Sequence, residues 1–134
     1  DDVSYVITVT QFKPGFKGFY TGLPGGTPDV DDMKPEKTML DELLKETGYR
    51  PTKFHYLGVQ FLNVSYSNAR GHLYLALGCE KISEQETEKN EQIHTELVLL
   101  DDWISYQCKN VDGSTLMTTV RALTNHLGYK FTKE

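Results

Sequence analysis

Two carboxylates one helical turn apart are the side chains of this chain best placed to do chemistry. Glu42 and Glu46 stand four residues apart within residues 41–49 (DELLKETGY), after a glycine turn at residues 23–26 (LPGG). Residues at i and i+4 project from the same face of a helix. Two hard oxygen donors on a rigid helix that faces a backbone turn suit Mg²⁺ or Mn²⁺ and a phosphate-containing substrate. The alternative is an ordinary surface helix with scattered acids.

The residues around this pair predict an amphipathic helix over about residues 34–47. Leu40, Leu43 and Leu44 follow the 3.6-residue period on another face, through which the helix is expected to pack on a sheet. Residues suited to helix ends flank the pattern: Asp31 or Asp32 as N-terminal cap, Pro35 in the first turn and Gly48 after the last turn.

This turn and helix resemble the Nudix box, whose pattern is G-x5-E-x7-R-E-U-x-E-E-x-G-U, where U is a large apolar residue. Counted from the start of the pattern, Gly26 matches and Asp32 stands where the first glutamate belongs. Counted from its end, the matching residues are Glu42, Leu43, Glu46, Gly48 and Tyr49. The counts differ by one residue, so we infer a one-residue insertion between Asp32 and Asp41.

Two further positions depart from the box. Asp41 replaces the arginine of the pattern, and Lys45 replaces the first glutamate of its E-E pair. Because residues 41 and 45 are i and i+4, we expect them to form an ion pair with exchanged charges on the helix surface. The positive charge of Lys45 beside the carboxylates is expected to weaken the binding of a second cation.

The resemblance extends over roughly residues 5–127 and is closest to the ADP-ribose and nucleoside-diphosphate-sugar pyrophosphatases of the Nudix family. Residues 9–15 (VTQFKPG) resemble their V-x-Q-[FY]-R-P strand, residues 23–26 their L-P-A-G turn, and residues 72–76 (HLYLA) their H-x-F-L-A strand. The resemblance implies a Nudix-type α/β/α sandwich with a mixed sheet. It also implies a Mg²⁺ or Mn²⁺ cofactor.

The resemblance also implies which residues form the site. The metal ligands are the Gly25 carbonyl, Glu42, Glu46 and Glu91, and the catalytic residues are Glu46, Glu91 and Glu88. Lys89 replaces another glutamate of the acidic loop, and because a lysine is a poor proton acceptor near neutral pH, Glu84, Glu86 or Glu88 is expected to take its role as general base.

Three further residues are expected to contact the substrate. Lys13 stands where the subfamily has an arginine, and Arg70 is the nearest other cation. Tyr66 lies in residues 64–68 (VSYSN), in place of an S-P-G-type loop, and can stack on a base or pack against the protein.

The composition agrees with a single domain over residues 1–134. A chain of 134 residues is long enough to bury a hydrophobic core. No apolar run in it approaches the ~20 residues that a membrane-spanning helix needs. The net charge of −5 argues against general nucleic-acid binding, so an anionic small molecule would need a bridging cation. Cys79 and Cys108 stand far apart in the sequence and form no C-x-x-C motif. Such cysteines are typical of the reducing cytoplasm, so we expect the protein to be cytoplasmic.

The remaining elements follow an α/β order. Strands are expected at about residues 3–12, 19–22, 54–63, 71–78 and 93–100, with a glutamate-rich loop at 80–91 between the last two, a short helix from Asp101, and a helix at 114–127. Ser114 is expected to cap this last helix, which carries Leu116, Val120, Leu123 and Leu127 at helical spacing.

The family's first strand is not visible ahead of residues 9–15. Either the chain is a fragment, or the fold lacks that strand, or another segment supplies it. An exposed sheet edge is a liability in water, so an omitted segment, a second copy in a homodimer or another partner chain is expected to cover it.

Two functions follow from the sequence. The first is a Mg²⁺-dependent Nudix hydrolase that cleaves the pyrophosphate of a nucleoside diphosphate linked to a sugar or similar group, as in ADP-ribose. The second is a Nudix-fold module with impaired catalysis, acting as a binding or structural subunit, which Asp41, Lys45 and Lys89 favour.

Overall fold

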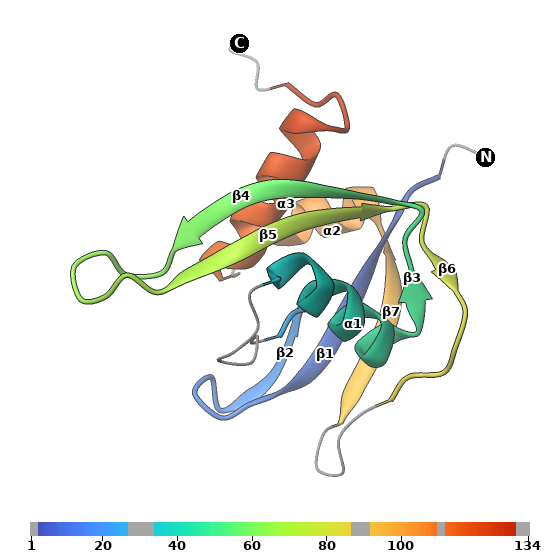
Figure 1. Ribbon diagram of the computed structural model, residues 1–134, viewed down its shortest axis with the longest axis horizontal. Coiled ribbons are helices and arrows are strands. Elements are labelled where there is room, and N and C mark those ends of the chain that lie inside the picture. Colours follow the sequence, from blue (N-terminus) through green and yellow to red (C-terminus); the bar gives the residue numbers. More distant parts are fainter. Residues whose placement is uncertain (1–2, 27–33, 87–91, 110–111, 131–134) are drawn as a thin grey trace.

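The computed structural model describes residues 3–26, 34–86, 92–109 and 112–130 of the chain. Two strands, a helix, five strands and two helices follow one another along these residues, so the chain has the α/β character that the sequence predicts (Figure 1). In chain order the elements are β1 (Tyr5–Lys13), β2 (Gly18–Gly22), α1 (Pro35–Thr47), β3 (Tyr49–Arg50), β4 (Lys53–Phe61), β5 (Arg70–Leu77), β6 (Glu80–Lys81), β7 (Ile93–Leu99), α2 (Leu100–Gln107) and α3 (Gly113–Asn125).

The strands form one three-stranded sheet and two smaller ladders. The larger sheet has the order β2-β1-β7, and β4 pairs with β5 in a long hairpin. The short strands β3 and β6, which the sequence did not predict, pair with each other. All pairings among the described residues are antiparallel, so the parallel part of the expected mixed sheet is not among them.

The helices cover different strands. Helix α3 packs on the β4–β5 hairpin, whereas α1 lies against β1 and β7 (Figure 1). Leu57 of β4, Leu73 of β5 and Ala122 of α3 form a buried apolar cluster, because burial of apolar area is the main favourable term in packing. No helix within the described ranges has the length and apolar character that a membrane crossing requires.

Helix α1 begins and ends close to the predicted positions. Pro35 is its first residue, where a missing N–H costs nothing, and Lys34 occupies the cap position without a side-chain cap. Asp31 and Asp32, the expected caps, lie outside the described residues. Gly48 ends the helix in a left-handed conformation, with φ of 79° and its N–H bonded to the Leu44 carbonyl. A side chain at Gly48 would also collide with the Ser83 carbonyl oxygen, 2.0 Å from an ideal Cβ.

The cap predicted for the last helix is wrong. Asp112, not Ser114, caps α3: its carboxylate accepts hydrogen bonds from the backbone N–H of Thr115 at 2.8 Å and from the Thr115 hydroxyl at 2.9 Å. The helix begins at Gly113, so Ser114 already lies in its first turn and cannot act as the cap.

The residues that α3 buries are not the four apolar residues at helical spacing that the sequence singles out. Leu116 and Leu127 are exposed, and the helix buries Thr115, Thr119 and Ala122 instead. Two hydrogen bonds allow the hydroxyl of Thr119 to be buried. It donates to the Thr115 carbonyl at 2.8 Å and accepts from the Trp103 indole N–H at 3.0 Å. Satisfied hydroxyls can be buried at little cost.

Candidate active site

Glu46 is more buried than Glu42, the other carboxylate of the predicted pair on α1. The residue is 7% exposed, and its Oε1 accepts a hydrogen bond from the backbone N–H of Gly25 at 3.1 Å. The backbone carbonyl of Glu46 accepts a hydrogen bond from the Thr95 hydroxyl of β7 at 3.2 Å. Glu46 is thus held by the glycine turn through its side chain and by the sheet through its backbone.

Glu42 lies against the next residue of the same turn. An ideal Cβ built on Gly26 would stand 2.6 Å from the Cγ of Glu42, 2.9 Å from its Cδ and 3.2 Å from its Oε2. Only glycine leaves room for this carboxylate. The spacing of the sequence therefore brings Glu42 and Glu46 together at Gly25 and Gly26, one glycine for each carboxylate.

The chemistry of these donors fits a hard divalent cation. Carboxylate and carbonyl oxygens are the ligands that Mg²⁺ and Mn²⁺ prefer. Within the described ranges, no group of three or more His, Cys, Asp or Glu residues is placed to hold a metal ion. Glu88, Lys89 and Glu91, the candidates from the acidic loop, lie outside the described residues.

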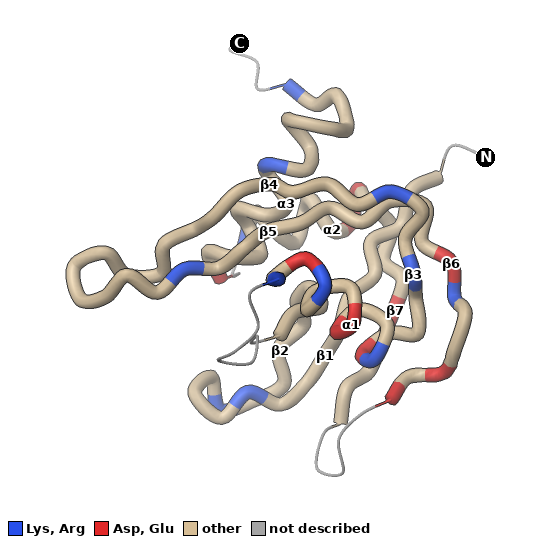
Figure 2. Tube along the Cα trace, viewed as in Figure 1, with Lys and Arg blue, Asp and Glu red and all other residues tan. Residues whose placement is uncertain are grey.

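The expected ion pair between Asp41 and Lys45 is not among the ion pairs of the described residues. The Asp41 carboxylate lies 2.9 Å from the ammonium group of Lys37, one turn before it, and both side chains are well exposed. A carboxylate on a helix can pair with a lysine four residues before or after it, and here Asp41 pairs with the earlier one, Lys37. Figure 2 shows basic and acidic positions mixed along α1.

The segment after β6 runs along the C-terminal end of α1. The Gly48 carbonyl accepts hydrogen bonds from the backbone N–H groups of Ile82 and Ser83, and the Lys45 carbonyl accepts one from Glu86 at 2.7 Å. This backbone contact brings the first part of the glutamate-rich loop to the helix end that carries Glu46. The side chains of Glu84 and Glu86 are exposed.

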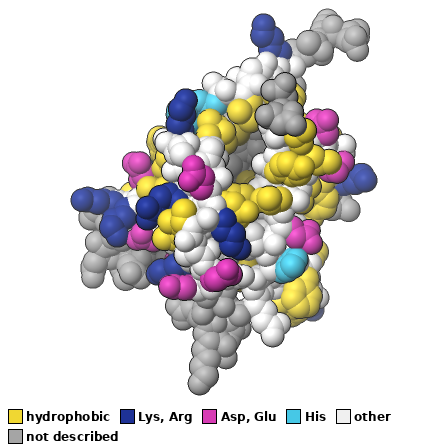
Figure 3. Space-filling model, turned by 90° about the vertical axis from the view of Figure 1, so that its right-hand side faces the viewer, with side chains coloured by type: hydrophobic (Ala, Val, Ile, Leu, Met, Phe, Trp, Pro, Cys, Tyr) yellow, Lys and Arg dark blue, Asp and Glu magenta, His cyan; other side chains and the backbone are white. Residues whose placement is uncertain are grey.

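A cavity of about 810 Å³ opens beside the two carboxylates. It is lined by the glycine turn, the first half of α1, β5 and parts of β1 and α3, and its volume lies in the range of small-molecule sites. Hydrophobic side chains surround a hollow on the face shown in Figure 3. Arg70 lines the cavity, whereas Lys13 and Tyr66 do not. Tyr66 is 87% exposed.

Sequence reasoning missed several residues that line this cavity. Phe54 and Tyr74 bring aromatic rings to it, and Thr38 brings a buried hydroxyl that has no hydrogen-bond partner among the residues that the structure describes. Burial raises the pKa of Tyr74, and the nearby Tyr56 and Glu36 add to the shift. The period-two pattern of β5 was the available signal for Tyr74, but a pattern alone does not tell which face meets a cavity.

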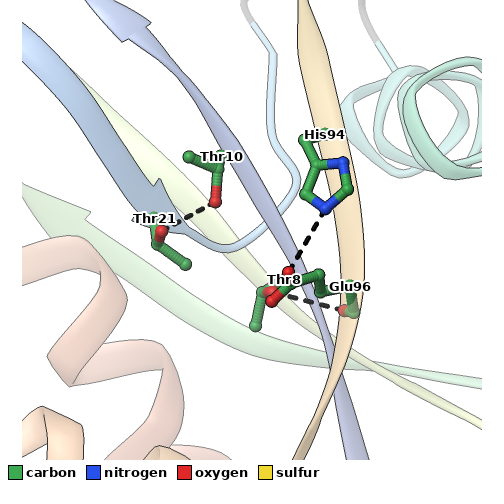
Figure 4. A network of polar contacts seen from close by, with 5 residues as sticks. All are labelled: Thr8, Thr10, Thr21, His94 and Glu96. Atoms are coloured by element: carbon green, nitrogen blue, oxygen red, sulfur yellow. Dashed lines mark hydrogen bonds and ion pairs between the residues drawn. The ribbon is translucent and has the colours of Figure 1, made fainter.

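A polar network fixes the sheet on which α1 rests (Figure 4). The hydroxyls of Thr10 and Thr21 lie 2.7 Å apart across β1 and β2, and the Thr8 hydroxyl donates to the Glu96 carbonyl of β7 at 3.2 Å. His94 contacts the Glu96 carboxylate at 3.2 Å. The contacts of Thr8 and Thr10 join neighbouring strands and stabilise the sheet, whereas the His94 contact lies within β7. These residues support the sheet beneath α1.

Comparison with known proteins shows the family and the fold of the chain. The NUDIX domain model matches residues 2–112, which is most of the chain, and the chain therefore belongs to the Nudix family. A solved structure titled "Crystal structure of ADP compounds hydrolase" has 16% sequence identity and a TM-score of 0.76, covering 92% of this chain and 68% of that one. It shows the same fold. A comparison with curated proteins gives no significant match. The expected family and fold class are thus confirmed.

Proposed function

We propose that the protein is a Mg²⁺- or Mn²⁺-dependent hydrolase that cleaves the pyrophosphate of a nucleoside diphosphate linked to a sugar or similar group. The observation that carries this proposal is the convergence of Glu42 and Glu46 on the Gly25–Gly26 turn. Membership of the Nudix family supports it, and so does a fold neighbour whose title names ADP compounds.

The roles of the residues follow from their chemistry. Glu42, Glu46 and the Gly25 carbonyl would hold the cation, with Glu91 as a further ligand from the acidic loop. When bound, the cation would neutralise diphosphate charge and polarise the attacking water. The chain carries a net charge of −5, so the cation offsets repulsion of an anionic substrate.

Other residues would act on the substrate and the water. Glu88 or Glu91 would accept the proton of the attacking water, since a carboxylate can act as a general base. Arg70, which lines the cavity, would contact a phosphate or sugar oxygen. Lys13 and Tyr66 would contact parts of the substrate that project beyond the cavity.

A second candidate function is a binding or structural module without catalysis. Lys45 and Lys89 favour it, because each places a positive charge where the family has a carboxylate. In this case the cavity would bind a nucleotide without turning it over.

A substrate screen separates the two functions. ADP-ribose, UDP-glucose and related compounds are incubated with the protein and Mg²⁺, Mn²⁺ or EDTA, and the nucleoside monophosphate product is measured by ion-exchange chromatography. We expect cation-dependent turnover of at least one compound, lost in Glu42→Gln and kept in the control Glu80→Gln, whose exposed carboxylate lies on β6. No turnover with any cation would reject the hydrolase and leave the binding module.

A further inference from the structure

One face of the β4–β5 hairpin carries aromatic rings that the carboxylate site does not use. Residues directly opposite each other in an antiparallel pair share a face, and Tyr56 is opposite Tyr74 while Phe61 is opposite Arg70. We call this surface the aromatic face; it consists of Phe54, Tyr56, Phe61, Arg70, His72 and Tyr74.

The side chains of the aromatic face hold one another in place. The rings of Phe54 and Tyr74 are stacked, with centroids 4.8 Å apart and planes 9° apart, and the ring of Tyr56 lies 5.3 Å from that of Tyr74. The Tyr56 hydroxyl lies 2.9 Å from Nδ1 of His72. The Arg70 guanidinium lies over the Phe61 ring, 5.2 Å from its centroid. Rings ordered in advance lose little freedom when a ligand binds.

The core of the hairpin lies on its other face. Leu57 and Leu73 pack against Ala122 of α3, so α3 does not cover the aromatic face. Tyr56 remains 55% exposed and Phe61 46% exposed. Burial in the core therefore does not account for these aromatic residues.

The aromatic face continues into the cavity beside the carboxylates. Phe54, Arg70 and Tyr74 line the same cavity as Gly25 and Gly26. The lining of this cavity thus combines aromatic rings and a guanidinium with the turn on which the two carboxylates converge. A ligand that matches it combines a planar aromatic ring with an anionic group.

We propose that the aromatic face binds the base of a nucleotide, with Tyr56 and Tyr74 stacking on the ring and Arg70 contacting an anionic oxygen. This proposal rests on the proposed function, because the same nucleotide would carry its diphosphate to the carboxylates. A mononucleotide fits better than a nucleic-acid strand, since the chain is acidic and Arg70 is the one arginine or lysine that lines the cavity within the described residues. Aromatic stacking accepts any base, because every base has a π-face.

The test measures binding without catalysis. AMP and ribose 5-phosphate are titrated in EDTA, and their dissociation constants are obtained by NMR; the two probes differ only in the base. We expect AMP to bind about tenfold or more tightly than ribose 5-phosphate, since stacking on a base contributes ~1–3 kcal/mol. Tyr56→Leu and Tyr74→Leu are expected to weaken AMP by about tenfold each and to leave ribose 5-phosphate unchanged.

Matched variants keep this test interpretable. Tyr129→Leu removes an exposed tyrosine that lies outside the aromatic face, and it should leave both constants unchanged. Tyr56→Phe keeps the ring and should keep the AMP affinity. If circular dichroism shows that a leucine variant does not fold, Arg70→Ala and Arg50→Ala are compared instead. Both arginines are exposed, but only Arg70 lines the cavity. Only Arg70→Ala should therefore weaken the binding of AMP.

The outcomes separate this proposal from the hydrolase. The base site is overturned if AMP and ribose 5-phosphate bind with equal affinity. It is also overturned if the substitutions of the tyrosines and Arg70 leave the AMP affinity unchanged. Both conclusions hold whether or not the protein is an enzyme. AMP binding that depends on these residues supports the base site. A protein that binds AMP in this way and hydrolyses nothing rejects the hydrolase alone.

Discussion

The Glu46 carboxylate accepts a hydrogen bond from the backbone N–H of Gly25 at 3.1 Å, a contact that joins residues 21 positions apart. It fixes the helix to the glycine turn and leaves Glu42 beside Gly26. One side chain thus acts as a structural clamp and as a proposed metal ligand. These two roles can be separated by substitution.

Replacement of Glu46 by glutamine should separate the clamp from the charge. The amide oxygen of Glu46→Gln can still accept from Gly25, so the melting temperature should change little. Loss of the charge should lower Mg²⁺-dependent kcat/KM by about 100-fold or more, because a bound cation supplies several kcal/mol of charge stabilisation. Full activity of this variant in a steady-state assay would remove Glu46 from the metal site.

The Gly26→Ala substitution should displace Glu42. The new Cβ would lie 2.6 Å from the Glu42 Cγ, so the carboxylate must move away from the turn. We expect kcat/KM to fall and the free energy of unfolding to drop by about 1–3 kcal/mol, as in overpacked sites. Gly15→Ala is the control, since nothing lies within 4 Å of its ideal Cβ and Gly15 does not line the cavity. Equal behaviour of the two variants in both measurements would contradict the close approach of Glu42.

The ion pair of Asp41 with Lys37 affects the expected result of Lys45→Glu, which restores the glutamate of the Nudix box at position 45. Because Asp41 already has a partner, Lys45→Glu alone should raise Mg²⁺ affinity as much as the double variant Asp41→Arg/Lys45→Glu. A gain of about threefold to tenfold is expected from replacing a nearby positive charge by a carboxylate. Isothermal titration with Mg²⁺ measures it, and Lys53→Glu controls for net charge. Unchanged affinity in both Lys45 variants would show that position 45 does not affect the metal.

Asp112 should contribute measurably to stability through the cap of α3. Asp112→Ala removes the acceptor of two hydrogen bonds from Thr115 and should lower the free energy of unfolding by about 1 kcal/mol. Ser114→Ala should have a much smaller effect, because Ser114 is inside the helix. Urea unfolding of the two variants provides the comparison. A larger loss for Ser114→Ala would restore Ser114 as the residue that matters at this helix end.

The sequence by itself determined the features that depend on neighbouring residues. Pro35 and Gly48 bound α1, because one lacks an N–H and the other accepts a left-handed backbone, and the spacing of Glu42 and Glu46 places them on one helix face. The order of strands and helices was predictable for the same reason, and together with the motifs it allowed the family to be predicted. Helix-end choices among nearby polar residues, such as Asp112 over Ser114, were already harder to predict.

Only the tertiary structure decided which distant residues meet. The contacts of Glu46 with Gly25 and of Glu42 with Gly26 depend on how the turn returns to the helix. On β4, strict alternation would place Phe61 and Tyr56 on opposite faces, but the irregularity between Tyr56 and Gly58 shifts the register by one residue and turns Phe61 to the side of Arg70. A period-two pattern carries no information about such a shift, so the aromatic face could be found only in the folded chain.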